Sequence, residues 1–259
     1  MNLQLSNTIM VVTGAAKGIG AGIAEALAAE GAIPVIIGRN EKDNQVLVDK
    51  LLAQGYQAAQ VVADLTNPDA CAAAIQEVAE KFGRIDGVVN NAGVNDGVGL
   101  ESGSYEQFIE SLHKNLVHYY LIAKAALPYL KASKGSIVNI GSKTAETGQG
   151  NTSGYAASNG GRNALTREWA VELLPYGIRV NAVIVAECFT PLYQKWIATL
   201  PDSDAKLKAI EAKIPLGNRM TTAAEIAAMV AFLLSPVSSH TTGQLIHVDG
   251  GYVHLDRAI

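Results

Sequence analysis

The chain has 259 residues, of which 49% are hydrophobic and 17% charged, and its formal net charge is −4. A chain of this length and composition is long enough to bury one large apolar core. The small negative charge and the lack of any basic run argue against nucleic acid and membrane surfaces as partners, because both are bound through clustered lysine and arginine.

The N-terminal segment and the cysteines bear on the cellular compartment. No basic segment precedes the first apolar run, Thr8 to Val12, and that run is far too short for a signal peptide or a membrane-spanning helix. The two cysteines, Cys71 and Cys188, show neither CxxC spacing nor a histidine at metal-ligand spacing, so no metal site is predicted. This usage favours a reducing compartment, and we expect a cytoplasmic protein.

Short β-branched runs alternate with helical stretches along the whole chain. The alternation predicts one doubly wound α/β domain over residues 1–259, with a parallel sheet of about seven strands flanked by helices. The expected strands are Ile9–Val12, Pro34–Ile37, Gln60–Val62, Gly87–Val89, Ser136–Ile140, Ile178–Val183 and Gln244–Val248. Four glycines are expected to end helices, namely Gly31, Gly55, Gly83 and Gly177.

A glycine-rich turn joins the first strand to the first helix. The segment Thr13-Gly14-Ala15-Ala16-Lys17-Gly18-Ile19-Gly20 has the spacing G-x-x-x-G-x-G. Glycines at such a junction let the backbone approach a pyrophosphate, and the helix N-terminus offers it free N–H groups. A plain structural turn is the alternative, but the β/α units that follow favour a dinucleotide site.

The residues after the second strand bear on which dinucleotide binds. An acidic residue there would bond the ribose 2′-hydroxyl of NAD, whereas a small residue with a nearby arginine accommodates the 2′-phosphate of NADP. This chain has Gly38-Arg39-Asn40, and Lys17 lies in the glycine-rich turn. Both features favour NADP as the cofactor. The alternative is that Arg39 is a solvated surface residue.

Motifs further along the chain carry a family resemblance. Asn90-Asn91-Ala92-Gly93 follows the fourth strand, Ser142 follows the fifth, and Tyr155 lies thirteen residues after Ser142. With the glycine-rich turn, and with Thr242-Gly243-Gln244 and Val248-Asp249-Gly250-Gly251 near the C-terminus, this order resembles the short-chain dehydrogenase/reductase family. The resemblance covers nearly the whole chain and implies a Rossmann-type oxidoreductase.

The resemblance implies a role for each matching residue. Tyr155 is expected to be the general acid–base group, Ser142 to bond the substrate oxygen, and Asn115 to hold a water in the proton relay. Asp64 would meet the adenine and Thr190 the nicotinamide end. The implied cofactor-binding set is Gly14, Lys17, Gly18, Ile19, Gly20, Arg39, Asp64, Leu65, Asn91, Ala92, Gly93, Tyr155, Asn159 and Thr190.

One departure from the family pattern removes a charge. The family has Tyr-x-x-x-Lys, where the lysine holds the nicotinamide ribose and favours the tyrosinate, but here Asn159 stands four residues after Tyr155. Residues i and i+4 share a helix face, so Asn159 is expected beneath Tyr155 in place of the lysine. A cation about 4.5 Å from a phenolate contributes roughly 3–4 kcal/mol at an effective dielectric near 20. Lys143, directly after Ser142, is the candidate replacement; the alternative is that Lys143 is a solvated loop residue.

The segment 143–152, between Ser142 and Tyr155, must border the reacting carbon, and it is strongly polar. A long acyl chain or a steroid would leave those polar groups unpaired, whereas a polyhydroxylated ligand would satisfy them. We therefore predict a sugar or polyol as the small-molecule substrate, and the chain resembles the aldose-oxidising branch of the family, of the L-fucose type. Alternatively, these groups bond one another or water. The expected substrate-contacting residues are Lys143, Glu146, Gln149, Asn151 and Glu187.

Two further stretches carry expectations. Residues 187–215 lack a strand pattern and contain Pro191, Trp196 and Pro201, which predicts a loop or helices that cover the substrate. Val185-Ala186 stands where the family has Pro-Gly, and the following Glu187 either points into the substrate pocket or is solvated. The apolar stretch 227–234 and the resemblance together predict a homotetramer; burial of that stretch in the core is the alternative.

Two other functions stay open on the sequence alone. A non-catalytic dinucleotide-binding sensor or scaffold is favoured by Asn159, but it would have no need of Ser142, Tyr155 and Asn115. A 3-oxoacyl or other ketone reductase predicts an apolar entrance and basic patches for a carrier protein, and neither is evident in the sequence.

Overall fold

The computed structural model describes residues 2–255, so the outermost residues of the expected domain, 1 and 256–259, lie outside the described residues. Seven parallel strands form one sheet in the order β3-β2-β1-β4-β5-β6-β7, which confirms the predicted doubly wound α/β fold. The strands are β1 (Ile9–Thr13), β2 (Ile33–Gly38), β3 (Ala59–Val62), β4 (Gly87–Asn90), β5 (Ser136–Ser142), β6 (Arg179–Val185) and β7 (Leu245–Val248).

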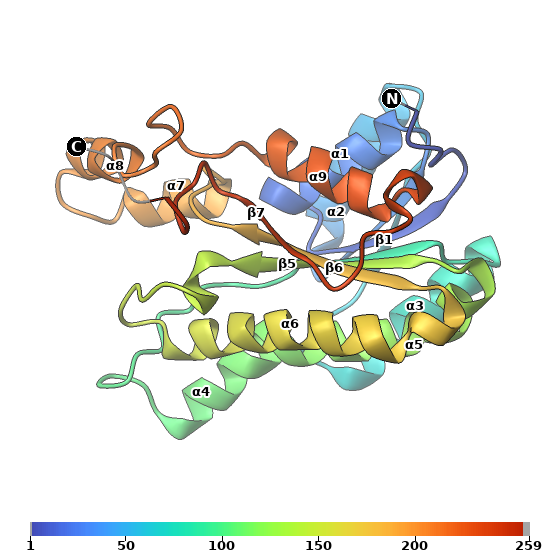
Figure 1. Ribbon diagram of the computed structural model, residues 1–259, viewed down its shortest axis with the longest axis horizontal. Helices are drawn as coiled ribbons and strands as arrows, with labels where there is room; N and C mark the ends of the chain where they lie inside the picture. The colour runs from blue at the N-terminus through green and yellow to red at the C-terminus, as the bar shows by residue number, and fades with distance from the viewer. Residues whose placement is uncertain (1, 256–259) are drawn as a thin grey trace.

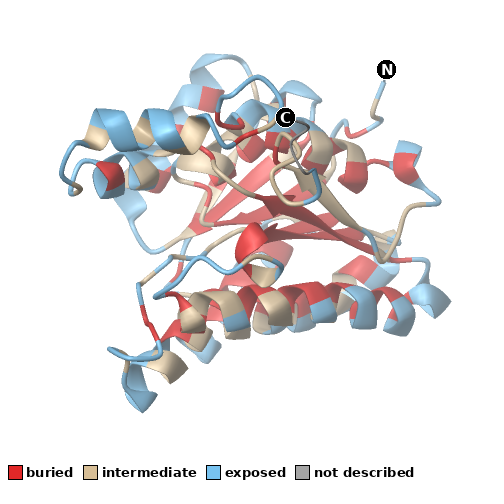
Figure 2. Ribbon diagram, turned by 60° about the vertical axis from the view of Figure 1, so that its left-hand side comes forward, coloured by how far each residue is buried: buried red, intermediate tan, exposed pale blue. Residues whose placement is uncertain are grey.

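The central strands are buried on both faces, and this explains their β-branched composition. Every residue of β1, β4 and β5 is buried, as a parallel sheet covered on both sides requires. Figure 2 shows this buried sheet lying between two more exposed layers of helices. The strand order reverses between β1 and β4, and ligands of such sheets bind beyond the carboxyl ends of the strands at that point.

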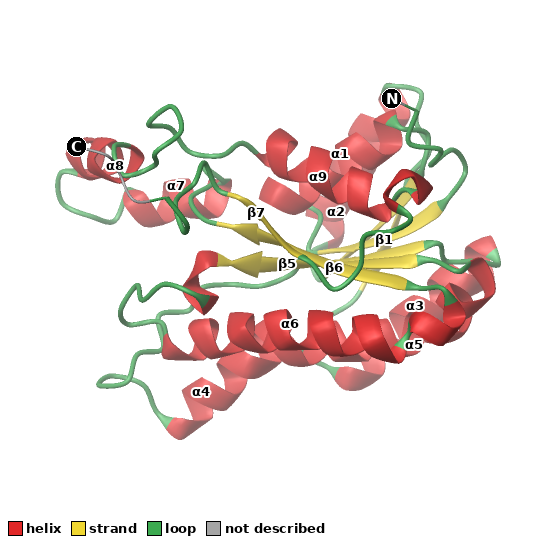
Figure 3. Cartoon of the chain, viewed as in Figure 1, coloured by secondary structure: helices red, strands yellow, loops and turns green. Residues whose placement is uncertain are grey.

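The helices form one layer on each face of the sheet (Figures 1 and 3). One layer holds α1 (Gly18–Ala29), α2 (Glu41–Ala53) and α9 (Ala223–Leu234), and its side chains form one core cluster with the sheet. The other holds α3 (Pro68–Phe82), α5 (His118–Ser133) and α6 (Ser153–Glu172), with a second cluster. The remaining helices are α4 (Tyr105–Leu112), α7 (Pro191–Ile197), α8 (Ser203–Glu211), a π-helical turn η1 (His113–Val117), and the 3₁₀ turns η2 (Lys143–Ala145), η3 (Leu174–Tyr176) and η4 (Pro236–Ser238).

Helix ends fall where glycine permits a left-handed backbone. The glycines expected to end helices have φ values of +82° at Gly31, +84° at Gly55, +72° at Gly83 and +68° at Gly177. Residues with a Cβ adopt such values only with strain, so these positions stop each helix and turn the chain toward the next strand.

The apolar stretch 227–234 is accounted for within one chain. It lies in α9, whose Ile226, Ala227, Val230, Ala231 and Leu233 are at most 2% exposed. A Cβ added at Gly22 of α1 would lie 2.9 Å from the Cβ of Ala223, so the two helices approach closely. Most of the stretch is therefore core within one chain, whereas Ala228 is exposed and Met229 and Phe232 are half-buried.

Candidate active site

A pocket of about 460 Å³ opens at the carboxyl ends of β1, β4, β5 and β6 and is covered by α7. Strand ends and the helix-rich segment 187–215 meet there, as Figure 1 shows for α7 and α8 beyond the tips of the strands. The pocket lies at the reversal of strand order, where the sequence placed the dinucleotide site. Its lining includes Gly14, Lys17, Gly18, Ile19, Gly20, Asn91, Ala92, Gly93, Ser142, Tyr155, Arg162 and Thr190.

The glycine-rich turn has the shape that a pyrophosphate requires. Gly14 has φ +64°, and a Cβ added there would lie 2.8 Å from the Cα of Ala92; Gly18 has φ +62°. Helix α1 begins at Gly18, and no side chain caps it, so its first N–H groups face the pocket free to bind an anion. These residues fit a dinucleotide.

Hydrogen bonds from the two residues that follow β4 hold this turn in place. The Nδ2 of Asn91 donates to the carbonyl oxygens of Thr13 and Gly14, at 2.9 and 3.1 Å. The Thr13 hydroxyl accepts from the backbone N–H groups of Asn91 and Ala92, at 2.9 and 3.1 Å. Asn91 therefore stabilises the junction between β1 and β4 from beside the pocket.

The residues expected around the adenosine end lie outside the pocket lining, apart from Lys17. Lys17 Nζ forms an ion pair with Asp43 Oδ2 at 2.7 Å, a partner that sequence reasoning missed. Arg39 and Asp64 are exposed and Leu65 is half-buried. Hydrogen bonds from the backbone and hydroxyl of Thr66 lower the pKa of Asp64, and the positive charge of Arg39 adds to that effect.

Ser142 and Tyr155 both line the pocket. The Ser142 hydroxyl accepts from the backbone N–H and the hydroxyl of Thr144, at 3.3 and 3.1 Å. With both lone pairs taken, its own hydrogen is free to donate to a bound substrate oxygen. Tyr155, in the first turn of α6, is half-buried, so its phenol can meet both a ligand and water.

Asn115 is buried in the π-helical turn η1 between α4 and α5. Its Oδ1 accepts from the backbone N–H of Val94 at 2.7 Å, and its Nδ2 donates to the carbonyl of Ser111 at 3.0 Å. The backbone carbonyl of Asn115 accepts from Arg162 Nε at 2.6 Å. Both the side chain and the carbonyl of this residue thus have protein partners.

Asn159 lies beneath Tyr155, as the helical spacing predicts. Its Nδ2 donates to the carbonyl of Tyr155 at 2.9 Å, and its Oδ1 accepts from Arg162 NH1 at 3.0 Å. Arg162, which sequence reasoning missed, is 2% exposed and lines the pocket. Its spacing could have identified it, because Arg162 stands seven residues after Tyr155 and so shares a helix face with Tyr155 and Asn159.

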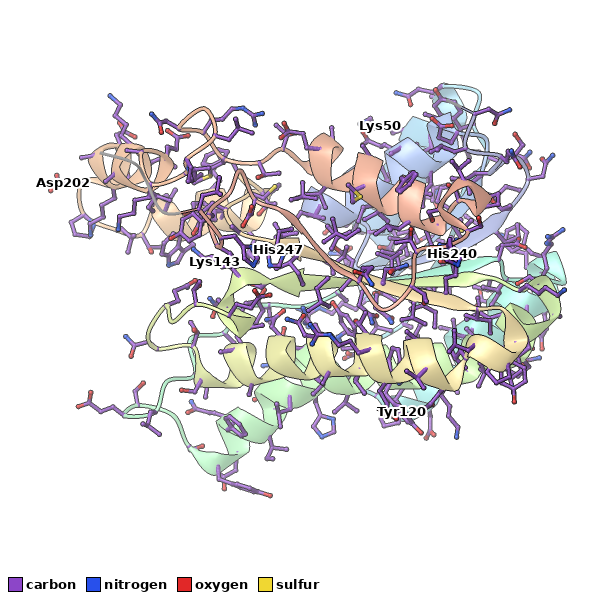
Figure 4. The ribbon with its side chains drawn as sticks, in the orientation of Figure 1. Lys50, Tyr120, Lys143, Asp202, His240 and His247 are labelled. Carbon is purple, nitrogen blue, oxygen red and sulfur yellow. The ribbon has the colours of Figure 1, made fainter. Side chains whose placement is uncertain are left out.

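Lys143 is neither solvated nor a free cation. Its side chain is 9% exposed and forms an ion pair with Glu187, whose side chain is 12% exposed. The ammonium also lies 4.2 Å from the ring centroid of Tyr252. Figure 4 shows Lys143 near the carboxyl end of β5, and neither Lys143 nor Glu187 is among the residues that line the pocket.

The structure also brings Glu146 together with two histidines that sequence reasoning did not single out. His247 Nε2 lies 3.1 Å and His254 Nε2 3.9 Å from a Glu146 carboxylate oxygen. Their ligand atoms all lie within 4.8 Å of one another, a spacing that a metal ion could bridge. The sequence predicted no such group, because Glu146 lies more than 100 positions before both histidines. Gln149 and Asn151, also expected at the substrate, are exposed.

The α7 wall of the pocket includes Cys188 and Tyr193. Burial raises the pKa of the Cys188 thiol to about 11, with a further contribution from the charge of Glu225, so the thiol stays protonated and is a poor nucleophile. Burial, and a hydrogen bond to the Glu187 carboxylate, raise the pKa of Tyr193 as well. Neither group is therefore suited to exchange a proton near neutral pH.

The fold, the glycine-rich turn and the Ser142–Tyr155 pair define a nicotinamide-dependent oxidoreductase. Known proteins agree: a family model described as enoyl-(acyl carrier protein) reductase matches residues 14–253. The L-fucose dehydrogenase of Oryctolagus cuniculus is 38% identical over 96% of this chain and 86% of its own. The chain belongs to the short-chain dehydrogenase/reductase family.

Solved structures extend this likeness to the whole backbone. The Cj0485 dehydrogenase is 45% identical with a TM-score of 0.95, covering 100% of this chain and 99% of its own. The aldohexose dehydrogenase of Thermoplasma acidophilum is 30% identical with a TM-score of 0.89, over 100% and 99% of the two chains.

Proposed function

We propose that the protein transfers a hydride between NADP and the carbinol or carbonyl carbon of a sugar or polyol, with L-fucose as the first substrate to test. The observation that carries the proposal is the polar entrance beside Ser142. The Lys143–Glu187 pair and the Glu146–His247 contact lie at the ends of β5, β6 and β7, and Lys143 directly follows Ser142 in the chain. Hydroxyl groups of a sugar would find donors and acceptors there.

The reaction requires two proton-handling groups from the chain. The nicotinamide, when bound, supplies the hydride acceptor or donor. Ser142 donates its free hydrogen to the substrate oxygen and orients it toward Tyr155. The Tyr155 oxygen takes the hydroxyl proton as a carbinol is oxidised, and returns it when a carbonyl is reduced. Gly14, Gly18 and the start of α1 would hold the pyrophosphate, in the same pocket that Ser142 and Tyr155 line.

The preference for NADP rests on the end of β2. A carboxylate there would repel a 2′-phosphate, but the chain has exposed Arg39 after Gly38. Lys17 adds a second cation, although Asp43 is paired with it at 2.7 Å. A 2′-phosphate would therefore displace Asp43 from Lys17 or share the ammonium with it.

A single screen tests both parts of the proposal. L-fucose, other aldoses, polyols and 3-oxoacyl thioesters are each assayed with NADP and NAD. We expect turnover with sugars, and at least tenfold tighter binding of NADP than of NAD by fluorescence titration of the cofactor-free protein. Equal or tighter binding of NAD would refute the cofactor assignment, and turnover of thioesters alone would refute the substrate class.

One observation favours an acyl substrate as the second candidate. Phe189, Leu192 and Trp196, at the start of the covering segment and on α7, are 48%, 57% and 46% exposed. An acyl chain could bury these side chains, and the matching family model is described as a carrier-protein reductase. The segment 143–152, which joins Ser142 to Tyr155, is strongly polar, so we rank the sugar first.

We also infer a cytoplasmic homotetramer, on the family resemblance. Most of the α9 stretch is core within one chain, but Ala228 is exposed and Met229 and Phe232 are half-buried, which leaves a surface for contact with a second copy. No helix in the described range 2–255 is long and apolar enough to cross a membrane. Light scattering gives the mass directly, and a monomer at micromolar concentration would refute the assembly.

A further inference from the structure

Arg162 is a buried cation without a counter-charge. Its guanidinium donates to the carbonyls of Asn115 and Ile140 and to Asn159 Oδ1, at 2.6, 3.1 and 3.0 Å. In the described part of the chain it makes no ion pair with a carboxylate, and its NH2 group has no hydrogen-bond partner. A buried charged donor left unpaired is costly, so such a group in a pocket points to a ligand.

The unpaired NH2 lies beside Gly93, at the wall of the cofactor pocket. Arg162 lines that pocket together with Gly93 and Tyr155. A Cβ added at Gly93 would lie 2.8 Å from Arg162 NH2 and 2.9 Å from Asn115 Oδ1, so the absence of a side chain at Gly93 leaves room for the guanidinium. The guanidinium carbon lies 6.0 Å from the Tyr155 ring centroid. Arg162 and the acid–base tyrosine therefore line the same cavity.

We propose that Arg162 supplies the positive charge of this active site, by favouring the Tyr155 phenolate and by offering its free NH2 donors to the ribose hydroxyls of the bound cofactor. The reaction in which this charge acts rests on the proposed function, but the charge itself does not. The assignment accounts for Asn159. Its amide oxygen accepts a hydrogen bond from Arg162 NH1 at 3.0 Å, whereas a lysine at this position would place a second cation beside the guanidinium.

Other charged groups around Tyr155 are less suited to this role. His118, on α5 behind Arg162, has its pKa lowered to about 4 by burial and by the charge of Arg162, so it is neutral above that pH. Tyr119, which packs 4.3 Å from the guanidinium, has its pKa raised by burial and stays a phenol. Lys143 is paired with Glu187, and Lys17 with Asp43. The remaining cation of the pocket lining is Lys195 on α7, and its side chain is exposed, so water screens its charge.

Titration of tyrosine tests the charge without a substrate or a cofactor. The chain has nine tyrosines, so the ultraviolet signal of Tyr155 is taken as the difference between each protein and its Tyr155→Phe counterpart. A nearby cation favours a phenolate, so loss of the Arg162 charge should make Tyr155 harder to ionise. We expect the Tyr155 midpoint to rise in Arg162→Met and to move little in Arg162→Lys.

Matched variants separate charge from structure. Arg167→Met removes an exposed arginine of the same helix and should leave the midpoint unchanged. Asn159→Lys should impair the parent but restore a low midpoint in the Arg162→Met background, because one cation then replaces the other. If Asn159→Lys is harmful in the parent and helpful in Arg162→Met, the two positions are energetically coupled.

The affinity for the cofactor is a second measurement. NADP should bind Arg162→Met about tenfold more weakly, as expected for lost hydrogen bonds from a charged donor.

The outcomes are decisive in either direction. A folded Arg162→Met protein, judged by circular dichroism and melting, that keeps both the parent midpoint and the parent affinity for NADP would show that Arg162 is purely structural. If Arg162→Met does not fold, Arg162→Gln, which can still donate to Asn115, takes its place. If instead no sugar is turned over by the parent, the proposed function fails while the titration result stands.

Discussion

At the scale of single residues, the role of a side chain in this site depends on its hydrogen-bond partners and not only on its amino acid type. Lys143 has the charge that the site lacks at position 159, yet Glu187 neutralises it. Asn159 has no charge, yet its Oδ1 holds a buried arginine beside Tyr155. The proton chemistry therefore depends on a set of partners rather than on one substituted position.

Replacing Tyr155 with Phe removes only a hydroxyl from the pocket. We expect turnover to fall at least 10³-fold, because no other described side chain of the lining is placed to exchange the substrate proton with Ser142. The dissociation constant for NADP, measured by fluorescence titration, should change less than threefold. Thr144→Val is the comparison: it removes one of the two bonds to the Ser142 hydroxyl, 3.1 Å long, and should reduce turnover far less. Substantial turnover by the Phe variant would refute the acid–base assignment.

The site was predictable from the sequence where a motif carries it. Gly14, Gly18, Ser142 and Tyr155 all line the pocket, because their spacing fixes them at the carboxyl ends of β1 and β5 and on α6. Arg162 was missed, since a lone arginine on a helix is ordinarily solvated. Only packing shows that it is 2% exposed.

At the scale of elements, the strands and helix ends followed from local chemistry, and the irregular parts did not. The strand runs lie within about two residues of their predicted ends, because β-branched runs between glycine stops have few other ways to fold. The π-helical turn His113–Val117 was not foreseen. It depends on contacts of Asn115 with Val94 and Arg162, which are distant in sequence.

Helix α9, which supports α1 and the glycine-rich turn, begins at a capping box with an ionic component. Thr222 and Glu225 bond each other's backbone N–H, and Arg219 reaches the Glu225 carboxylate. The Arg219 contact, followed by the Thr222 bonds, lowers the pKa of Glu225 to about 2. Since the folded pKa is depressed, this contribution to stability is complete above about pH 4.5 and is lost as the pH falls toward 2.

Glu225→Gln keeps a cap acceptor but removes the charge. We expect the free energy of unfolding to fall by about 0.5–1 kcal/mol at pH 7, a modest figure because the side chain is 42% exposed. The difference from the parent should shrink below pH 4.5 and vanish near pH 2. Urea unfolding between pH 2.5 and 7 measures it, with exposed Glu168→Gln as the control. A difference that stays constant with pH would mean that the cap alone, and not the charge, is responsible.

At the scale of the whole molecule, stability is unevenly distributed between the sheet and the segment that covers the pocket. The sheet and its two helix layers hold the buried core. By contrast α8 has no buried residue, and Ile197 is the one buried residue of α7. Segments with so little core open locally at small free-energy cost. The covering segment can thus admit ligands while the pocket floor stays rigid.

Ligand binding should stabilise this covering segment selectively. Tyr193 and Lys195 of α7 line the pocket, and Leu192 and Trp196 beside them are 57% and 46% exposed. If opening of residues 190–211 must release the ligand, NADP at about 100 times its dissociation constant adds roughly 2.7 kcal/mol to the opening free energy. Amide hydrogen exchange there should then slow about 100-fold, whereas exchange in the buried strand β5 should be unchanged. Protection confined to the glycine-rich turn, with residues 190–211 exchanging as before, would show that the segment does not close over the cofactor.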